Sequence, residues 1–109
     1  MISILVPAYN EAARIGETVD ALRQLDLGDD TEIIVIDDGS TDGTSAVADD
    51  AGATVVLRQP NGGKGAALRA GLAIASGEIL LLIDADLGAT ASEAARLARP
   101  VLAGTADMT

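Results

Sequence analysis

The sequence predicts an α/β fold in which an open parallel sheet carries helices on both faces. Short apolar runs of strand length alternate with longer segments whose apolar residues recur at helical spacing. Clusters of Gly, Asp, Asn and Pro separate the two kinds of segment, which is typical of turns. This alternation indicates βαβ units joined by right-handed crossovers. The 109 residues suit a single domain.

The apolar runs are the predicted strands. The first is unbroken, which is typical of a strand buried on both faces, and the last is the most apolar. The four expected strands cover residues 2–6, 31–36, 53–57 and 78–83. Residues 106–109 resemble the opening of a further strand.

The intervening segments are expected to be helical. The expected helices cover residues 11–25, a short stretch from the turn at 39–43 to about 51, residues 64–75, and a last helix from about 90. The predicted apolar faces are Ala12, Ile15, Val19 and Leu22 in the first of these and Leu68, Leu72 and Ala75 in the third.

Three features predict where helices begin and end. Gly52 is the expected C-cap of the short helix. Thr90 and Glu93 have the spacing of a capping box, which predicts a helix start there. Pro100 is expected to end or kink that helix.

Composition excludes several classes of function. The net charge of −10 makes nonspecific binding of nucleic acid or an anionic membrane a poor expectation. The absence of Cys and His removes disulfides, thiolate sites, Ser-His-Asp triads and imidazole ligands, so carboxylates must do any acid–base chemistry. The N-terminal run lacks a basic flank and cleavage site, and residues 79–83 are too few to cross a bilayer. We therefore expect a cytoplasmic protein, with membrane association only through a region beyond residue 109.

The polar residues gather where the predicted strands end. In an open parallel sheet, ligands bind outside the carboxyl ends of the strands. The four loops concerned cover residues 7–11, 37–44, 61–65 and 84–86. Four segments far apart in sequence are thus expected to meet at one edge of the sheet.

Asp84 and Asp86 are candidate metal ligands. Residues two apart on an extended strand point the same way, roughly 6–7 Å apart, so a cation would relieve the repulsion between their carboxylates. Hard oxygen ligands favour Mg²⁺ or Mn²⁺ shared with substrate phosphates. The alternative is that both aspartates are turn or helix-capping residues.

Asp37 and Asp38 lie where nucleotide-binding folds place an acid against a ribose or base. Turn chemistry explains an Asp-Gly-Ser sequence equally well. Lys64, the only lysine, sits among glycines and is a candidate phosphate contact, although it could also be an ordinary surface residue. Its spacing is not that of a Walker A loop, since Gly65 stands where Ser or Thr belongs.

The first loop offers two further candidates. Tyr9, the only aromatic residue, could flank a base or fill a gap in the core. Glu11 could contact a ligand or serve as an N-terminal acid favoured by the helix dipole.

These blocks in this order resemble family 2 glycosyltransferases with the Rossmann-like GT-A fold. The matching blocks are VPAYNE at 6–11, DDGSTDGT at 37–44, NGGKGAALRAG at 61–71 and DADL at 84–87, and they are most similar to those of polyprenyl-phosphate sugar synthases. The resemblance implies nucleotide contacts from Pro7, Ala8, Tyr9, Glu11, Asp37, Asp38, Lys64, Asp84 and Ala85, and a metal on Asp84 and Asp86.

The resemblance also implies the reaction and the partners. A sugar would pass, with inversion at its anomeric carbon, from a UDP- or GDP-linked donor to an acceptor hydroxyl or phosphate, such as a polyprenyl phosphate or a saccharide. Family members are about twice this length or more, so residues 1–109 are expected to be the nucleotide-sugar-binding half of a truncated GT-A domain. The acceptor site and catalytic base would lie beyond Thr109. Polyprenyl-phosphate mannose synthases tend to read D-A-D-L-Q, whereas Gly88 stands at the last position here.

Other classes of function remain open at this point. A noncatalytic nucleotide-binding module would share every feature of the donor site. A nucleotidyltransferase also uses acidic metal sites, but normally has a glycine-rich loop after the first strand, and residues 7–11 contain no glycine. A dehydrogenase would need the G-x-G-x-x-G fingerprint after that strand, which is missing.

Overall fold

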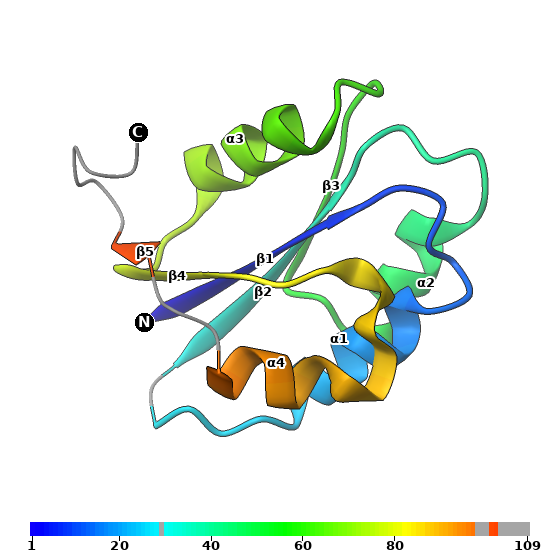
Figure 1. The fold of residues 1–109 in the computed structure, drawn as a ribbon. Helices are drawn as coiled ribbons and strands as arrows, with labels where there is room; N and C mark the ends of the chain where they lie inside the picture. Colours follow the sequence, from blue (N-terminus) through cyan, green and yellow to red (C-terminus); the bar gives the residue numbers. More distant parts are fainter. Residues whose placement is uncertain (29, 98–100, 103–109) are drawn as a thin grey trace.

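The computed structural model describes residues 1–28, 30–97 and 101–102, and it contains one five-stranded sheet in the order β3-β2-β1-β4-β5 (Figure 1). The strands are β1 (Ile2–Ala8), β2 (Thr31–Asp37), β3 (Val55–Arg58), β4 (Ile79–Leu82) and β5 (Val101–Leu102). The first four run parallel, which confirms the predicted α/β class. The short β5 pairs antiparallel with β4 and was not expected. The strand predicted at 106–109 lies outside the described residues.

Helices cover both faces of the sheet. They are α1 (Ile15–Arg23), α2 (Thr44–Ala51), α3 (Lys64–Ile74), α4 (Ala91–Leu97) and the 3-10 helix η1 (Ala85–Thr90). In Figure 1, α3 lies on one face, whereas α1, α2 and α4 lie on the other. The larger core cluster forms where α1, α2 and α4 meet the sheet, and a smaller cluster of Leu5, Ile34, Ile36 and Ala67 lies beneath α3.

The position of β1 determines where a crevice can form. It pairs with β2 on one side and β4 on the other, so the chain proceeds outward from β1 to β3 and then crosses back to β4. The strand order therefore reverses at β1, and the loops that follow β1 and β4 leave neighbouring strands at the centre of the sheet and lead to the same face. In open α/β sheets this switch point is where ligands bind.

Two predicted helices differ from the observed ones. The first begins at Ile15 instead of residue 11, although Ile15, Val19 and Leu22 are buried as expected. In α3 the buried residues are Ala67 and Gly71, and the predicted face was wrong, since Leu72 is exposed. The physical reason is close packing: a Cβ on Gly71 would lie 2.8 Å from Cδ1 of Ile36.

The predicted end of α2 and the predicted start of α4 agree with the structure. Gly52 caps α2 in a left-handed conformation, with φ 98°. Helix α4 begins at Ala91, next to Thr90, whose hydroxyl donates to the carbonyl of Leu87 at 2.7 Å. Pro100 lies outside the described residues. Within the described part of the chain, no helix combines the length and apolarity that crossing a membrane requires.

Candidate active site

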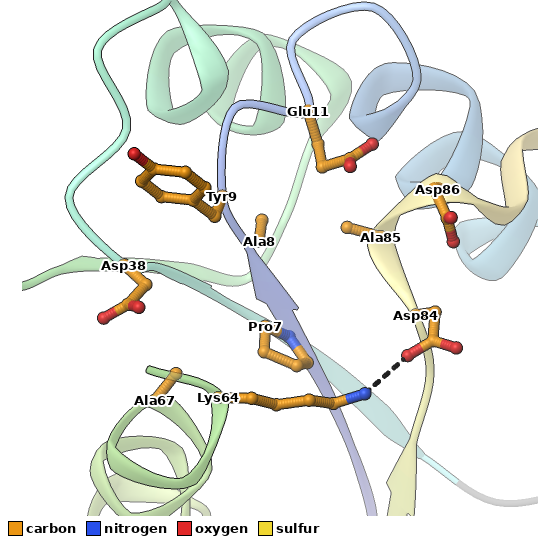
Figure 2. A pocket seen from close by; sticks show the side chains of 10 residues that line it. All are labelled: Pro7, Ala8, Tyr9, Glu11, Asp38, Lys64, Ala67, Asp84, Ala85 and Asp86. Atoms are coloured by element: carbon orange, nitrogen blue, oxygen red, sulfur yellow. Dashed lines mark hydrogen bonds and ion pairs between the residues drawn. The ribbon is translucent and has the colours of Figure 1, made fainter. Parts of the chain in front are cut away.

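A pocket of about 390 Å³ opens at the carboxyl ends of the strands. Its lining comes from all four loops that the sequence singled out (Figure 2). The lining residues are Pro7, Ala8, Tyr9, Glu11, Asp38, Lys64, Ala67, Asp84, Ala85 and Asp86. Of the residues predicted from sequence, only Asp37 does not line this pocket. Ala67, one turn into α3, was not anticipated, and no polar signal in the sequence marked it.

The β1–α1 loop forms one wall. Tyr9 is 49% exposed at the mouth of the pocket, so the reading of this residue as a filler of the core was wrong. Glu11 precedes α1 by four residues, and its carbonyl accepts the N–H groups of Arg14 and Ile15. Glu11 is therefore not in the first turn of α1, and its side chain projects toward the pocket (Figure 2).

Hydrogen bonds tie this wall to the β2–α2 loop, and we call this set the loop clasp. It joins residues 10–12 to residues 40–44. The bonds run from Asn10 N to Ser40 Oγ (2.8 Å), Glu11 N to Thr44 Oγ1 (3.0 Å), Ala12 N to Asp42 Oδ2 (3.2 Å), and from Thr41 N (2.8 Å) and Oγ1 (3.3 Å) to Asn10 Oδ1. Asn10 has φ 52°, a left-handed conformation that asparagine tolerates better than most residues. The Ser, Thr and Asp residues of DDGSTDGT thus serve largely to hold the wall in place.

Asp37 is part of the same scaffold. It is fully buried, and its carboxylate accepts hydrogen bonds from Ser40 N at 2.9 Å and Ser45 Oγ at 2.5 Å. Burial raises the pKa of Asp37, but these hydrogen bonds and the charge of Arg58 outweigh it, so the net pKa lies below the ordinary value. Because its oxygens are bonded within the loop and it does not line the pocket, Asp37 has a structural role.

Asp38 does line the pocket, and it also organises the loop before α3. One carboxylate oxygen accepts from Gln59 Nε2 at 2.8 Å and Gly62 N at 2.9 Å, and the other accepts from Gly63 N at 2.8 Å. The Gln59 hydrogen bond lowers the pKa of Asp38, and with the two backbone N–H groups it outweighs the opposing effect of burial. Asp38 is therefore held as a carboxylate that fixes the glycine-rich loop against the pocket.

Asp84 and Asp86 form the opposite rim. Both are exposed, and Asp84 pairs with Lys64 across the pocket at 2.9 Å (Figure 2). The expected geometry was wrong in one respect: β4 ends at Leu82, and Asp86 lies in the first turn of η1 instead of on an extended strand. The two side chains nevertheless line the same pocket. With side-chain exposures of 65% and 61%, the Lys64–Asp84 ion pair contributes little to stability.

The rim fits a shared divalent metal. The carboxylates are accessible, and Asp84 already pairs with the ammonium group of Lys64. No group of three or more His, Cys, Asp or Glu side chains in the described residues could hold a metal on its own. Two carboxylates completed by water and substrate phosphate oxygens are, however, the arrangement that Mg²⁺ commonly uses. Asp84 and Asp86 would hold such an ion.

Known proteins with similar sequences and structures are glycosyltransferases. Glucosyl-3-phosphoglycerate synthase of Mycobacterium tuberculosis is 43% identical over 93 residues, covering 79% of this chain and 29% of that protein. Its crystal structure with Mn²⁺, UDP and glucosyl-3-phosphoglycerate matches with a TM-score of 0.69 and 40% identity, covering 78% of this chain and 33% of that one.

Two further relatives have other sugars or acceptors in their names. A mannosyltransferase of Pyrobaculum calidifontis, solved with GDP-Man and Mn²⁺, matches with a TM-score of 0.72 and 35% identity, covering 78% of this chain and 27% of that one. An undecaprenyl-phosphate 4-deoxy-4-formamido-L-arabinose transferase of Aeromonas hydrophila is 33% identical, covering 95% of this chain and 34% of that protein.

These matches confirm the GT-A type of α/β fold. The chain spans about a third or less of the length of the relatives it matches. The family model for glycosyl transferase family 2 matches residues 3–109. Fold, pocket and sequence agree, and the chain belongs to glycosyl transferase family 2.

Proposed function

We propose that this chain is the nucleotide-sugar-binding half of a glycosyltransferase that uses a UDP- or GDP-linked donor and Mg²⁺ or Mn²⁺. The observation that carries the proposal is the meeting of four strand ends at one pocket. That pocket combines four carboxylates, Glu11, Asp38, Asp84 and Asp86, with a single lysine, Lys64. Relatives solved with UDP or GDP-Man and Mn²⁺ support the choice of ligands.

Each side of the pocket has a distinct role in the proposal. The wall formed by Pro7, Ala8, Tyr9 and Glu11 and the carboxylate-braced loop at Asp38 would hold the nucleoside. Lys64 would leave Asp84 and place its ammonium group against the diphosphate. Asp84 and Asp86 would hold the metal, with the backbone of Ala85 beside the ligand.

The proposed reaction passes the sugar to an acceptor hydroxyl or phosphate. Negative charge develops on the departing nucleoside diphosphate, and a bound divalent ion stabilises such charge as a Lewis acid. Lys64 would add a second positive charge on the same side. An inverting transfer also requires a base that deprotonates the acceptor. One relative was solved with phosphoglyceric acid and another is an undecaprenyl-phosphate sugar transferase, and for this chain the proposed acceptor is a polyprenyl phosphate or a saccharide.

The metal-binding rim provides the decisive test. Asp86→Ala should lower the Mn²⁺-dependent affinity for UDP and GDP at least about a hundredfold, because half of the protein's metal ligands are lost. Titration calorimetry with and without EDTA measures this effect. The matched control is Asp50→Ala, which removes an exposed carboxylate from α2, away from the pocket. Equal affinity of wild type and Asp86→Ala would count against the site.

A turnover assay with UDP-glucose and GDP-mannose separates transfer from binding alone. Metal-dependent nucleotide binding without release of sugar would favour a noncatalytic nucleotide-binding module for this chain by itself. Sugar release that depends on Asp86 would favour the transferase.

A further inference from the structure

A buried hydroxyl on α1 holds the turn that carries Asp86. Thr18 is fully buried, and its Oγ1 donates to the carbonyl oxygen of Ala85 at 2.7 Å. The same oxygen accepts the N–H of Gly88 at 2.8 Å. One side chain thus bridges the backbone on both sides of Asp86. Figure 1 shows this segment, directly after β4, passing close to α1.

Packing does not explain why this position is a threonine. The other buried residues of α1 are the apolar Ile15, Val19 and Leu22. The carbonyl of Arg14 lies 3.1 Å from the hydroxyl and could satisfy it within the helix. The shorter contact nevertheless goes to Ala85, 67 residues along the chain. The hydroxyl therefore serves the turn after β4.

Gly88 matches this arrangement. Its φ of 57° and ψ of −135° are accessible to glycine and strained for residues with a Cβ. A Cβ there would also lie 3.0 Å from Oε2 of Glu17. The departure from D-A-D-L-Q thus has a local physical reason: glycine permits the backbone conformation in which its N–H reaches Thr18.

Asp86 depends on this backbone for its position. Its carboxyl group has no hydrogen-bond partner among the residues that the structure describes, and the exposed Arg14 donates to its backbone carbonyl at 3.4 Å. With Ala85 and Gly88 both fixed, the intervening residues have little freedom to turn the carboxylate away from the pocket.

From these contacts we infer that Thr18 is a positioning residue, which sets the carboxylate of Asp86 for the metal without touching any ligand itself. The inference rests on the proposed function. Its specific consequence is that loss of the hydroxyl weakens the contribution of the metal to nucleotide binding and spares the contribution of the nucleoside wall.

The experiment compares three variants of the chain. Thr18→Val keeps the shape and removes the hydroxyl, and Thr18→Ser restores it. Thr54→Val is the matched control, because its Oγ1 also accepts a backbone N–H, from Ile33 at 2.9 Å, at the opposite end of the sheet. For each, calorimetry gives the ratio of UDP dissociation constants in EDTA and in Mn²⁺.

Thr18→Val should reduce that ratio about tenfold, as is typical for loss of an outer-shell partner. The affinity in EDTA should stay unchanged, and Thr18→Ser and Thr54→Val should behave as wild type. An unchanged ratio in Thr18→Val, or an equal loss in EDTA and in Mn²⁺, would overturn the positioning role while the proposed function stands. Absence of any Mn²⁺ effect in wild type would overturn the proposed function itself.

A measurement on wild type covers the case in which Thr18→Val does not fold. The amide of Gly88 should exchange with solvent slowly, because its N–H is buried against Thr18 Oγ1. Exchange as fast as that of Gly43, an exposed glycine, would overturn the inference.

Discussion

Two groups of aspartates at the same edge of the sheet differ in how they are bonded. In the β2–α2 loop, Asp37 and Asp38 are buried and each accepts several hydrogen bonds. At the end of β4, Asp84 and Asp86 are exposed, and an ion pair to Lys64 is the one side-chain contact of that pair within the described residues.

The two groups of carboxylates have different roles: one fixes the backbone of the loop, and the other is accessible to a cation. A carboxylate whose oxygens are occupied by donors determines where the backbone lies, and it costs free energy to remove. A carboxylate left open to solvent contributes little to stability but is free to receive a cation. In this pocket the two kinds of aspartate face each other, with Asp38 serving as a member of the first group that also reaches the lining.

The largest expected loss of stability comes from removing a buried aspartate of the first group. Asp37→Ala should lower the free energy of unfolding by about 3 kcal/mol, because Ser40 and Ser45 lose a charged acceptor inside the protein. Asp86→Ala should change it by less than about 0.5 kcal/mol. Urea denaturation of both variants measures the contrast, and equal destabilisation would show that the two groups do not differ in this way.

A smaller effect is expected from the loop backbone. Gly39 has φ 79°, and a Cβ there would lie 2.7 Å from the backbone N of Asn61, so Gly39→Ala should cost about 2 kcal/mol. Gly43→Ala is the matched control in the same loop, with φ −86° and open space around the added methyl group. It should stay within about 0.5 kcal/mol of wild type. Thermal unfolding of the pair would sharpen the comparison, and similar melting temperatures would contradict it.

The smallest expected effect is on how the free energy of unfolding changes at acidic pH. The pKa values of Asp37, Asp38 and Asp42 lie below the ordinary 3.8, so the folded state binds fewer protons than the unfolded state as pH falls through that region. Stability should therefore be complete above an ordinary aspartate pKa and decline below it. The pKa of Asp42 is lowered chiefly by the hydrogen bond from the hydroxyl of Thr44. Asp42→Asn should make the decline shallower by less than one proton, measured by unfolding between about pH 3 and pH 7. An unchanged slope of unfolding free energy against pH would show that Asp42 does not contribute to the acid sensitivity.

The sequence predicted the architecture because its signals were local. Apolar runs located all four parallel strands to within two residues at every end. The polar residues after them, together with the family resemblance, identified nine of the ten pocket-lining residues. Turn and capping residues such as Gly52 act over a few bonds, so their roles also follow from the sequence.

What the sequence could not provide depends on contacts between distant segments. The start of α1 is delayed because the amides of Glu11 and Ala12 donate to the β2–α2 loop. The buried face of α3 consists of Ala67 and Gly71, since small residues allow close approach to the sheet, and a pattern of large apolar residues pointed elsewhere. The role of Asp37 and the bridge from Thr18 to the β4–η1 turn likewise require coordinates.

The loop clasp has a consequence for how the pocket is assembled. Its hydrogen bonds join residues 30–33 positions apart, whereas a helical bond spans four. A peptide containing only the first loop cannot form them, so this wall exists only once β1 and β2 have paired, with Ala8 opposite Asp37. A slip of one residue in that pairing would turn the strand faces over and carry every clasp partner out of reach. Correct pairing of β1 with β2 and formation of this pocket wall therefore depend on each other.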